Sequence, residues 1–158
     1  MGDQLKPIAL LVMLDAIQNR VIQNREKGKR TWVFIDEIYL FFMYQYSGEY
    51  LHKCWKRYRK LNACLTGITQ NIEECLLPET ARMMLANSEF LIMLNQAATD
   101  RAELKEVLGL SDTQLGFVTN SPTGSGLVRV GGAVVPLIND FPKNSLYRLM
   151  STKAGEVF

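Results

Sequence analysis

The stretch Thr31-Trp32-Val33-Phe34-Ile35-Asp36-Glu37-Ile38-Tyr39 decides how the rest of this chain is interpreted. It is a run of β-branched and aromatic residues without a helical period, and it contains two adjacent carboxylates. Uninterrupted apolarity over so few residues predicts a strand buried on both faces, as in parallel sheets. Because ligands of open α/β sheets bind beyond the carboxyl ends of the strands, we expect Asp36 and Glu37 to face a ligand crevice.

Two interpretations of this acidic pair stay open. Four hydrophobic residues followed by Asp-Glu form the Walker B arrangement of nucleotide-hydrolysing ATPases. In that arrangement the aspartate helps to hold Mg²⁺, mostly through water, and the glutamate orients and deprotonates the attacking water. In the alternative, the strand is buried structure and its acidic end caps the next element, since carboxylates favour the first turn of a helix. Short motifs occur often by chance, so the remaining sequence has to discriminate.

The composition describes one folded domain of ordinary size. The chain has 158 residues, of which 47% are hydrophobic and 22% charged, which is typical of soluble globular proteins. The net charge of +2 does not by itself indicate nucleic-acid binding, although basic residues cluster in 25–30 and 53–60. The three cysteines and the one histidine do not have the spacing of a zinc site. The odd number of cysteines fits a reducing cytoplasm. No apolar run approaches the ~20 residues of a membrane-spanning helix.

Helices and strands are expected to alternate along the chain. The patterns predict helices over 4–27, 49–61, 78–87 and 101–108, and the capping box Ser111-x-x-Gln114 opens a further short helix. Strands are expected in the run that begins at Thr31, over 63–69 and 89–94, in a hairpin of 127–130 and 133–135, and over 146–151. This alternation predicts an α/β fold, with a mostly parallel sheet flanked by helices and an antiparallel β-hairpin near the C-terminus.

Several residues are expected to mark the ends of these elements. Capping residues are Asp3 for the first helix and Thr99 or Asp100 for the helix at 101–108, while Gly28 and Asn62 are expected to end helices. Ser47-Gly48 is expected to break the chain before the second helix, with Ser47 as its cap. The prolines and the Asn-Asp pair are expected to keep 136–145 irregular.

Two other polar features are candidates for phosphate contacts. Gln70, with Asn71, follows the strand 63–69, where an amide can bond a γ-phosphate or an attacking water; alternatively it satisfies loop backbone. The predicted helix 49–61 also carries basic residues, for which two interpretations stay open, a solvated face or a phosphate contact. These residues are Lys53, Lys56, Arg57, Arg59 and Lys60. The glycines of 124–132 do not form a phosphate-binding loop, because neither Lys-Ser, Lys-Thr nor a predicted helix follows them.

With the strands placed, the chain resembles a known family. The resemblance rests on the run Thr31 to Phe42, on Trp-Lys-Arg-Tyr-Arg-Lys at 55–60 and on Thr-Gly-Ile-Thr-Gln-Asn at 66–71. It also rests on the segment 81–90 and on Asn95-Gln96-Ala97-x-x-Asp100-Arg101. Together these segments are similar to the C-terminal part of the Vir/Tra-type conjugation ATPases of type IV secretion systems, in particular those of Gram-positive conjugative elements.

The resemblance implies a function and a set of site residues. It implies a RecA-like motor fold that hydrolyses ATP with Mg²⁺, forms oligomers (hexamers in the parent protein), and docks at the inner face of the cell membrane on a secretion channel. Asp36 would be the magnesium residue, Glu37 the catalytic base and Gln70 the γ-phosphate sensor. Arg57, Arg59 and Arg101 are the arginines that would contact a phosphate across a subunit boundary.

One feature of the family is absent from this sequence. No Gly-Lys pair in the chain is followed by Ser or Thr; Gly28-Lys29 is followed by Arg30. Without that P-loop nothing supplies the amide cradle, the lysine charge or the magnesium-binding hydroxyl. We therefore expect residues 1–158 to be the C-terminal portion of a RecA-like motor domain. We expect this portion by itself not to hydrolyse ATP. Because a missing strand leaves sheet edges open, we expect the chain to dimerise, to swap or to rearrange its sheet.

Three hypotheses about function follow. In the first, the parent is an ATPase that energises conjugative transfer of DNA and protein. In the second, the chain is a non-enzymatic interaction module whose basic helix and hairpin bind channel partners or nucleic acid. In the third, it belongs to a DNA-pumping ATPase of the coupling-protein type. Glu37→Gln discriminates the first two, and nucleic-acid binding with a steep salt dependence would favour the third.

Overall fold

The computed structural model describes residues 5–70, 72–96, 101–119 and 121–150. These residues divide into two units, which are described separately. The first unit comprises residues 1–88 and 102–109, and the second comprises 89–101 and 110–158. The predicted α/β class is confirmed, with a parallel pair of strands in the first unit and an antiparallel three-stranded sheet in the second.

The first unit begins with a long helix that packs on a parallel strand pair. Helix α1 (Lys6–Glu26) ends as predicted, because Gly28 adopts a φ of 68° and its N–H donates to the carbonyl of Arg25. Strand β1 (Thr31–Ile35) pairs in parallel with β2 (Ala63–Gly67). The predicted cap Asp3 lies outside the described residues.

Short helices connect and follow these two strands. They are the 3₁₀ helix η2 (Ile38–Phe41), α2 (Gln45–Arg57), the 3₁₀ helix η3 (Tyr58–Leu61), α3 (Ile72–Leu76), α4 (Glu79–Ala86) and α5 (Arg101–Leu108). Asn62 ends η3 in the left-handed conformation, as predicted. The helix α3 was missed, and the predicted caps Thr99 and Asp100 of α5 lie outside the described residues.

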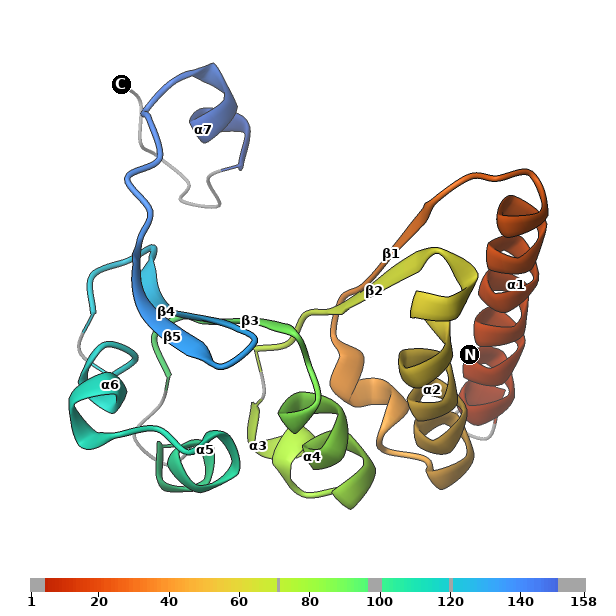
Figure 1. The fold of residues 1–158 in the computed structure, drawn as a ribbon, viewed down its shortest axis with the longest axis horizontal. Helices are drawn as coiled ribbons and strands as arrows, with labels where there is room; N and C mark the ends of the chain where they lie inside the picture. Colours follow the sequence, from red (N-terminus) through yellow and green to blue (C-terminus); the bar gives the residue numbers. More distant parts are fainter. Residues whose placement is uncertain (1–4, 71, 97–100, 120, 151–158) are drawn as a thin grey trace. The chain divides into compact units, whose positions relative to one another are not determined.

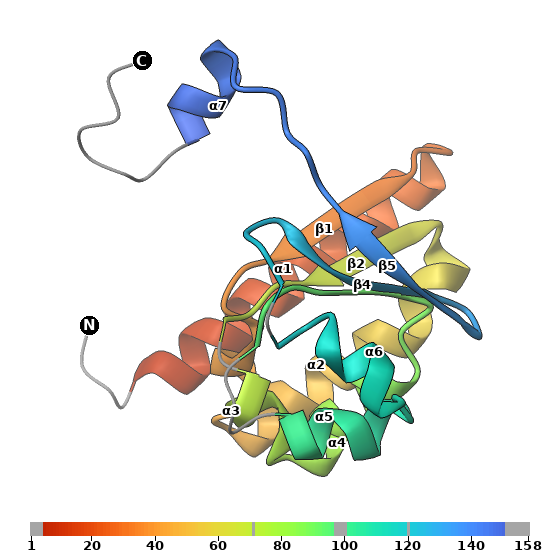
Figure 2. The same cartoon turned by 90° about the vertical axis from the view of Figure 1, so that its left-hand side faces the viewer.

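The core of the first unit lies between the strand pair and the helices α1 and α2, which cover one face of it (Figure 2). One cluster joins residues from α1, β1, η2, α2, α3 and α4, and a second joins α1, α2, η3 and β2. The members are Leu14, Ile35, Ile38, Phe41, Leu51, Cys75 and Met84 in the first, and Val21, Cys54, Tyr58 and Ala63 in the second.

The prediction that β1 is buried on both faces is wrong in this structure. Trp32 is 60% exposed and Phe34 is 65% exposed, whereas Ile35 is buried. The reason is that helices cover the face that carries Val33 and Ile35, and the alternating side chains of β1 point to the other face. In the strand predicted at 89–94, Phe90 and Ile92 are also more than half exposed.

The expected break at Ser47-Gly48 is also wrong. Both residues lie in the first turn of α2, which begins at Gln45 rather than at Glu49. The Ser47 hydroxyl donates to the carbonyls of Phe41 (2.5 Å) and Tyr44 (3.0 Å), so it satisfies carbonyls just before the helix while its backbone is helical. A serine in the first helical turn can therefore stabilise the helix start from inside the helix.

The second unit is an antiparallel sheet with two short helices. Strand β3 (Phe90–Met93) pairs with β4 (Ser125–Val130), which forms the predicted hairpin with β5 (Ala133–Ile138) about Gly131-Gly132. The predicted capping box of α6 (Asp112–Gly116) is present, because the Gln114 N–H donates to Ser111 Oγ and the Ser111 N–H donates to Gln114 Oε1. The parallel part of the fold is thus β1 and β2, and β3 joins the hairpin instead.

Two predictions for the last part of the chain are wrong. The residues 146–150 of the expected last strand belong to the helix α7 (Ser145–Met150). Asn144 starts this helix, because its Oδ1 accepts from the N–H of Tyr147 at 3.0 Å. The expected irregular segment 136–145 begins later than predicted, since β5 continues through Pro136 to Ile138. Among the described strands β5 pairs with β4 alone, so Pro136 lies on an edge where its missing N–H costs little.

Candidate functional site

The acidic turn, defined as Asp36 and Glu37, lies at the carboxyl end of β1. Ile35 is in register with Gly67, so the chain leaves both strands at the same edge of the pair. The Ile68 N–H donates to the Ile35 carbonyl at 2.8 Å, and the Ile38 N–H donates to the Ile68 carbonyl at 3.0 Å. Ile68, which follows β2, therefore bonds to the residues immediately before and immediately after the acidic turn.

The backbone of Glu37 has an unusual conformation. Its φ of 50° and ψ of 48° are left-handed, and Asn62 is the only other non-glycine residue of the described chain with a positive φ. A residue with a Cβ loses roughly 1–2 kcal/mol in this region. The Glu37 N–H donates to Oδ1 of Asp36 at 3.0 Å, which helps to keep the turn in place. Such strained residues concentrate at functional sites, where the surrounding structure enforces them.

The two carboxylates differ in their environment. Asp36 is exposed, whereas Glu37 is half-buried and its Oε2 is buried without a hydrogen-bond donor among the described residues. A buried acceptor without a donor costs free energy, so a water or a cation at Oε2 would be bound favourably. The turn thus combines one exposed carboxylate with one whose inner oxygen lacks a protein partner.

A glycine beside the turn was missed by the sequence analysis. A Cβ on Gly67 would overlap Cδ1 of Ile38, the residue that follows the acidic turn. The absence of a side chain at Gly67 lets Ile38 pack against the end of β2, where it is 6% exposed. A glycine at the end of a predicted strand, before Gln70, is the signal that could have indicated this close approach.

Gln70 lies at the same edge as the acidic turn. It is exposed and follows Gly67 by three residues, in the chain that bonds to Ile35 and Ile38. Its predicted neighbour Asn71 lies outside the described residues. The structure therefore gathers Asp36, Glu37 and Gln70 at one edge of the strand pair.

Arg57 and Arg59 lie away from the acidic turn. Arg57 ends α2 and Arg59 lies in η3, and both are exposed. Since η3 leads into the amino end of β2, the five-residue strands separate these arginines from Asp36 by roughly 17 Å at ~3.3 Å per residue. Arg101 begins α5, and its side chain lies outside the described residues.

Comparisons with protein-family models and with curated proteins found no match. Among solved structures, VirB4 of Thermoanaerobacter pseudethanolicus matches with a TM-score of 0.80 and 24% sequence identity. The match covers 90% of this chain and 39% of the VirB4 chain. This chain has the fold of part of VirB4. The resemblance inferred from the sequence is therefore confirmed at the level of the fold.

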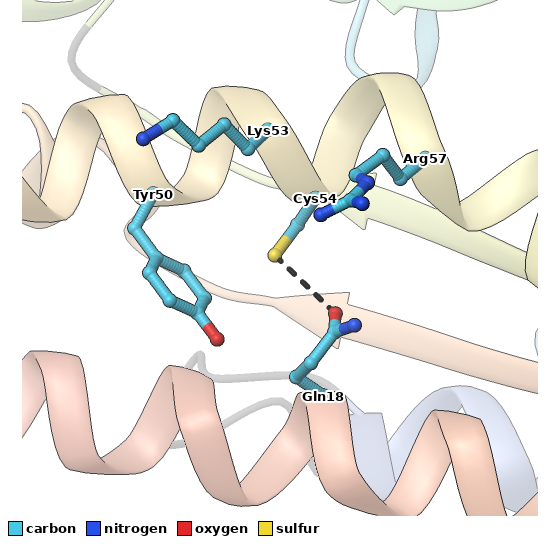
Figure 3. A pocket seen from close by; sticks show the side chains of 5 residues that line it. All are labelled: Gln18, Tyr50, Lys53, Cys54 and Arg57. Carbon is cyan, nitrogen blue, oxygen red and sulfur yellow. Dashed lines mark hydrogen bonds between the residues drawn. The ribbon is translucent and has the colours of Figure 1, made fainter.

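A small pocket lies between α1 and α2 of this VirB4-like fold (Figure 3). Its volume is about 90 Å³, and its lining is Gln18, Tyr50, Lys53, Cys54 and Arg57. Pockets for drug-sized ligands have volumes of roughly 300–1,000 Å³. The pocket is therefore too small for a nucleotide.

The thiol in this pocket is not suited to catalysis. Cys54 Sγ donates to Gln18 Oε1 at 3.7 Å (Figure 3). Burial raises the pKa of the Cys54 thiol, although its hydrogen bond with Tyr58 and the charge of Arg57 act in the opposite direction. A thiol whose pKa is raised stays protonated near neutral pH and is a weak nucleophile.

Within the described ranges, no three side chains of His, Cys, Asp or Glu gather as metal ligands. Mg²⁺ needs few protein ligands, because it keeps several waters and binds substrate phosphates. The acidic turn therefore fits a Mg²⁺ that is held mainly by water and phosphate. None of the helices in the described part of the chain is long and apolar enough to cross a membrane.

Proposed function

We propose that this chain supplies the acidic half of a Mg-ATP hydrolysis site in a motor protein of the VirB4 type. The observation that carries the proposal is the acidic turn at the carboxyl end of a parallel strand pair. There Glu37 has a left-handed backbone and a buried Oε2 to which none of the described residues donates. The VirB4-like fold supports the same assignment.

Each residue at this edge would have a distinct role. The exposed Asp36 would bind the waters around Mg²⁺, which supplies charge neutralisation at the phosphates when it is bound. Glu37 would accept the proton of the attacking water, and no donor among the described residues already occupies its Oε2. Gln70 would hydrogen-bond the γ-phosphate or the water. One of the arginines Arg57, Arg59 and Arg101 would act on a phosphate held by a neighbouring subunit.

The phosphate cradle would come from residues that this sequence does not contain. The chain spans 39% of the VirB4 chain that it matches, and it has no Gly-Lys-Ser or Gly-Lys-Thr. We infer that the complete site belongs to an oligomeric type IV secretion ATPase, hexameric in the parent. On this proposal it acts in the cytoplasm at the inner face of the membrane, with secretion-channel proteins as partners and DNA or a DNA–protein complex as cargo.

Glu37→Gln in the full-length protein tests the catalytic role. The amide keeps the size of the side chain but cannot accept a proton, so turnover should fall by about 10²–10⁴-fold while ATP affinity stays nearly unchanged. Glu26→Gln is the matched control, because Glu26 is exposed at the end of α1. Unchanged turnover in the Glu37 variant would refute the assignment of Glu37 as the catalytic base and would favour the non-enzymatic interaction module.

A titration of the 158-residue chain with a fluorescent ATP analogue, with and without Mg²⁺, tests the half-site interpretation. We expect no binding up to millimolar concentrations, because the chain lacks the amide cradle. Mg²⁺-dependent binding that disappears in Asp36→Ala would mean that another element replaces the P-loop. The interpretation as half of a site would then be wrong.

A further inference from the structure

The end of the first unit opposite the acidic turn carries a cluster of cations. We call it the basic end and define it by six exposed residues, which are Arg25, Lys27, Lys29, Arg30, Arg59 and Lys60. They come from two segments, 25–30 and 59–62, that are far apart in the sequence. Glu26 is the one acidic residue in these two segments, so the local charge is strongly positive although the net charge of the chain is only +2.

The parallel pairing of β1 and β2 brings the two segments together. Thr31 is in register with Ala63, and the Thr31 N–H donates to the Asn62 carbonyl at 3.2 Å. Nε of Arg30 donates to Oδ1 of Asn62 at 3.2 Å, which fixes this guanidinium against the other segment. Figure 1 shows the α1–β1 connection beside the turn from η3 into β2. The basic end is therefore one continuous surface.

Helix dipoles explain only part of this charge. A cation in the last turn of a helix offsets the negative end of the helix dipole, and Arg25 lies in the last turn of α1. Lys27, Lys29 and Arg30 lie beyond the end of α1, where that effect fades. Each of these side chains is exposed, so they also do not contribute to the core. Their accumulation on one surface indicates a polyanionic partner.

We propose that the basic end binds the phosphate backbone of a nucleic acid without sequence preference. Lysines and arginines on an exposed surface bind nucleic-acid backbones electrostatically, and the arginine fork pairs with phosphate oxygens. A membrane surface fits less well, because bilayer-binding segments usually add exposed apolar side chains. The one large apolar residue of the two segments, Leu61, is half-buried and packs against the core around Val21 and Tyr58. Since the acidic turn lies at the other end of the strands, nucleic acid bound at the basic end would not occupy the acidic turn of the same chain.

Fluorescence anisotropy of the 158-residue chain tests this proposal. The probes are labelled mixed-sequence DNA of about 20 nucleotides, single-stranded and as a duplex, at several salt concentrations from about 50 to 200 mM. The test variant is Lys27→Gln/Lys29→Gln/Lys60→Gln. The matched control is Lys6→Gln/Lys105→Gln/Lys143→Gln, which leaves the basic end intact. Both variants lower the net charge by the same amount, from +2 to −1 (2 − 3 = −1), and circular dichroism verifies that both are folded.

We expect the wild-type chain to bind both probes with a dissociation constant below about 100 µM at the lowest salt concentration. The test variant should lose at least about tenfold in affinity, and its salt slope should fall by about 2, since each phosphate contact contributes roughly 0.7–0.9. The control should stay within about threefold of the wild type.

Three results would overturn the proposal. The first is an absence of wild-type binding, and the second is an equal loss of affinity in both variants, which would reflect net charge alone. The third is binding to phosphatidylserine vesicles but not to DNA, which would assign the basic end to an anionic membrane. None of these results depends on ATP hydrolysis. Nucleic-acid binding at the basic end can therefore be refuted while the proposed ATPase function stands, and the ATPase function can be refuted while the binding stands.

Discussion

A glutamate at position 37 occupies a backbone conformation that glycine would adopt without strain. The surrounding structure enforces it, because Ile38 is fixed by its bond to the Ile68 carbonyl and by its packing over Gly67. Asp36 adds a bond from its Oδ1 to the Glu37 N–H. Natural proteins tolerate such strain mainly where the side chain is needed for function. We therefore propose that the side chain of Glu37 is kept for the function of this protein.

Replacing Glu37 by glycine should stabilise the first unit. Relief of the left-handed strain, about 1–2 kcal/mol, exceeds the entropic cost of glycine, about 0.5–1 kcal/mol. We expect a gain of about 0.5–1 kcal/mol in the free energy of unfolding, measured in urea. Glu49→Gly is the control, because Glu49 lies inside α2 and a helical glycine should cost about 1 kcal/mol. A loss of stability in both variants would refute the argument from strain.

At the scale of elements, the contact of α1 with α2 and η3 contains several titratable groups. Burial raises the pKa of the Cys54 thiol and of the Tyr50 and Tyr58 hydroxyls. For Tyr58 the neighbouring Cys54 acts in the same direction, as do Cys54 and Asp15 for Tyr50. The folded protein therefore favours the protonated forms of all three groups.

This shift predicts an alkaline loss of stability. The ordinary pKa values are 9.0 for the thiol and 10.0 for the phenols, and the pKa values in the folded state are higher. The stabilisation of the folded state by these protonated groups is therefore complete at a pH below the ordinary pKa values. It is lost as the pH rises through the higher pKa values of the folded state. Urea unfolding from pH 7 to 11 should show this decline. Tyr58→Phe should make the decline shallower, and Tyr46→Phe, whose side chain is 77% exposed, should not. An equally steep decline in all three proteins would contradict the assignment to this contact.

At the scale of the whole molecule, the strand pair of the first unit has free edges. Among the described strands β1 and β2 pair only with each other, and the uncovered face carries Trp32 and Phe34. Open edges with exposed apolar side chains favour association with another chain. We propose that this chain self-associates as a dimer or a swapped oligomer.

Light scattering over a range of concentrations tests self-association. The expected mass is larger than the 18.0 kDa of one chain. Phe34→Lys should shift the mass towards the monomer, because it places a charge on the uncovered face. Ile138→Lys is the control, since Ile138 is 81% exposed in the second unit. A monodisperse monomer at high concentration would count against the proposal.

Local patterns predicted most of the elements but not their burial. Gly28, Asn62 and the Ser111–Gln114 capping box mark boundaries through bonds within a few residues, and all three were read correctly. The prediction of a last strand is wrong, because Leu146 to Met150 suit either a strand or a helix and the Asn144 side chain caps a helix there. Asp36, Glu37 and Gln70 were found as polar residues at strand ends. Gly67 was overlooked, because its close contact with Ile38 joins two segments far apart in the sequence.

The sequence by itself determined the order of the main helices and strands from α1 to β5 (apart from α3), the acidic end of β1 and the absence of a P-loop motif, because these follow from local composition and short-range bonding. Only the tertiary structure decided that β3 joins the C-terminal hairpin, that one face of β1 is uncovered, and that Glu37 is left-handed. It also decided that the basic segments 25–30 and 59–62 meet at one end of the first unit. These features depend on contacts between distant segments, whose free energies no local pattern encodes.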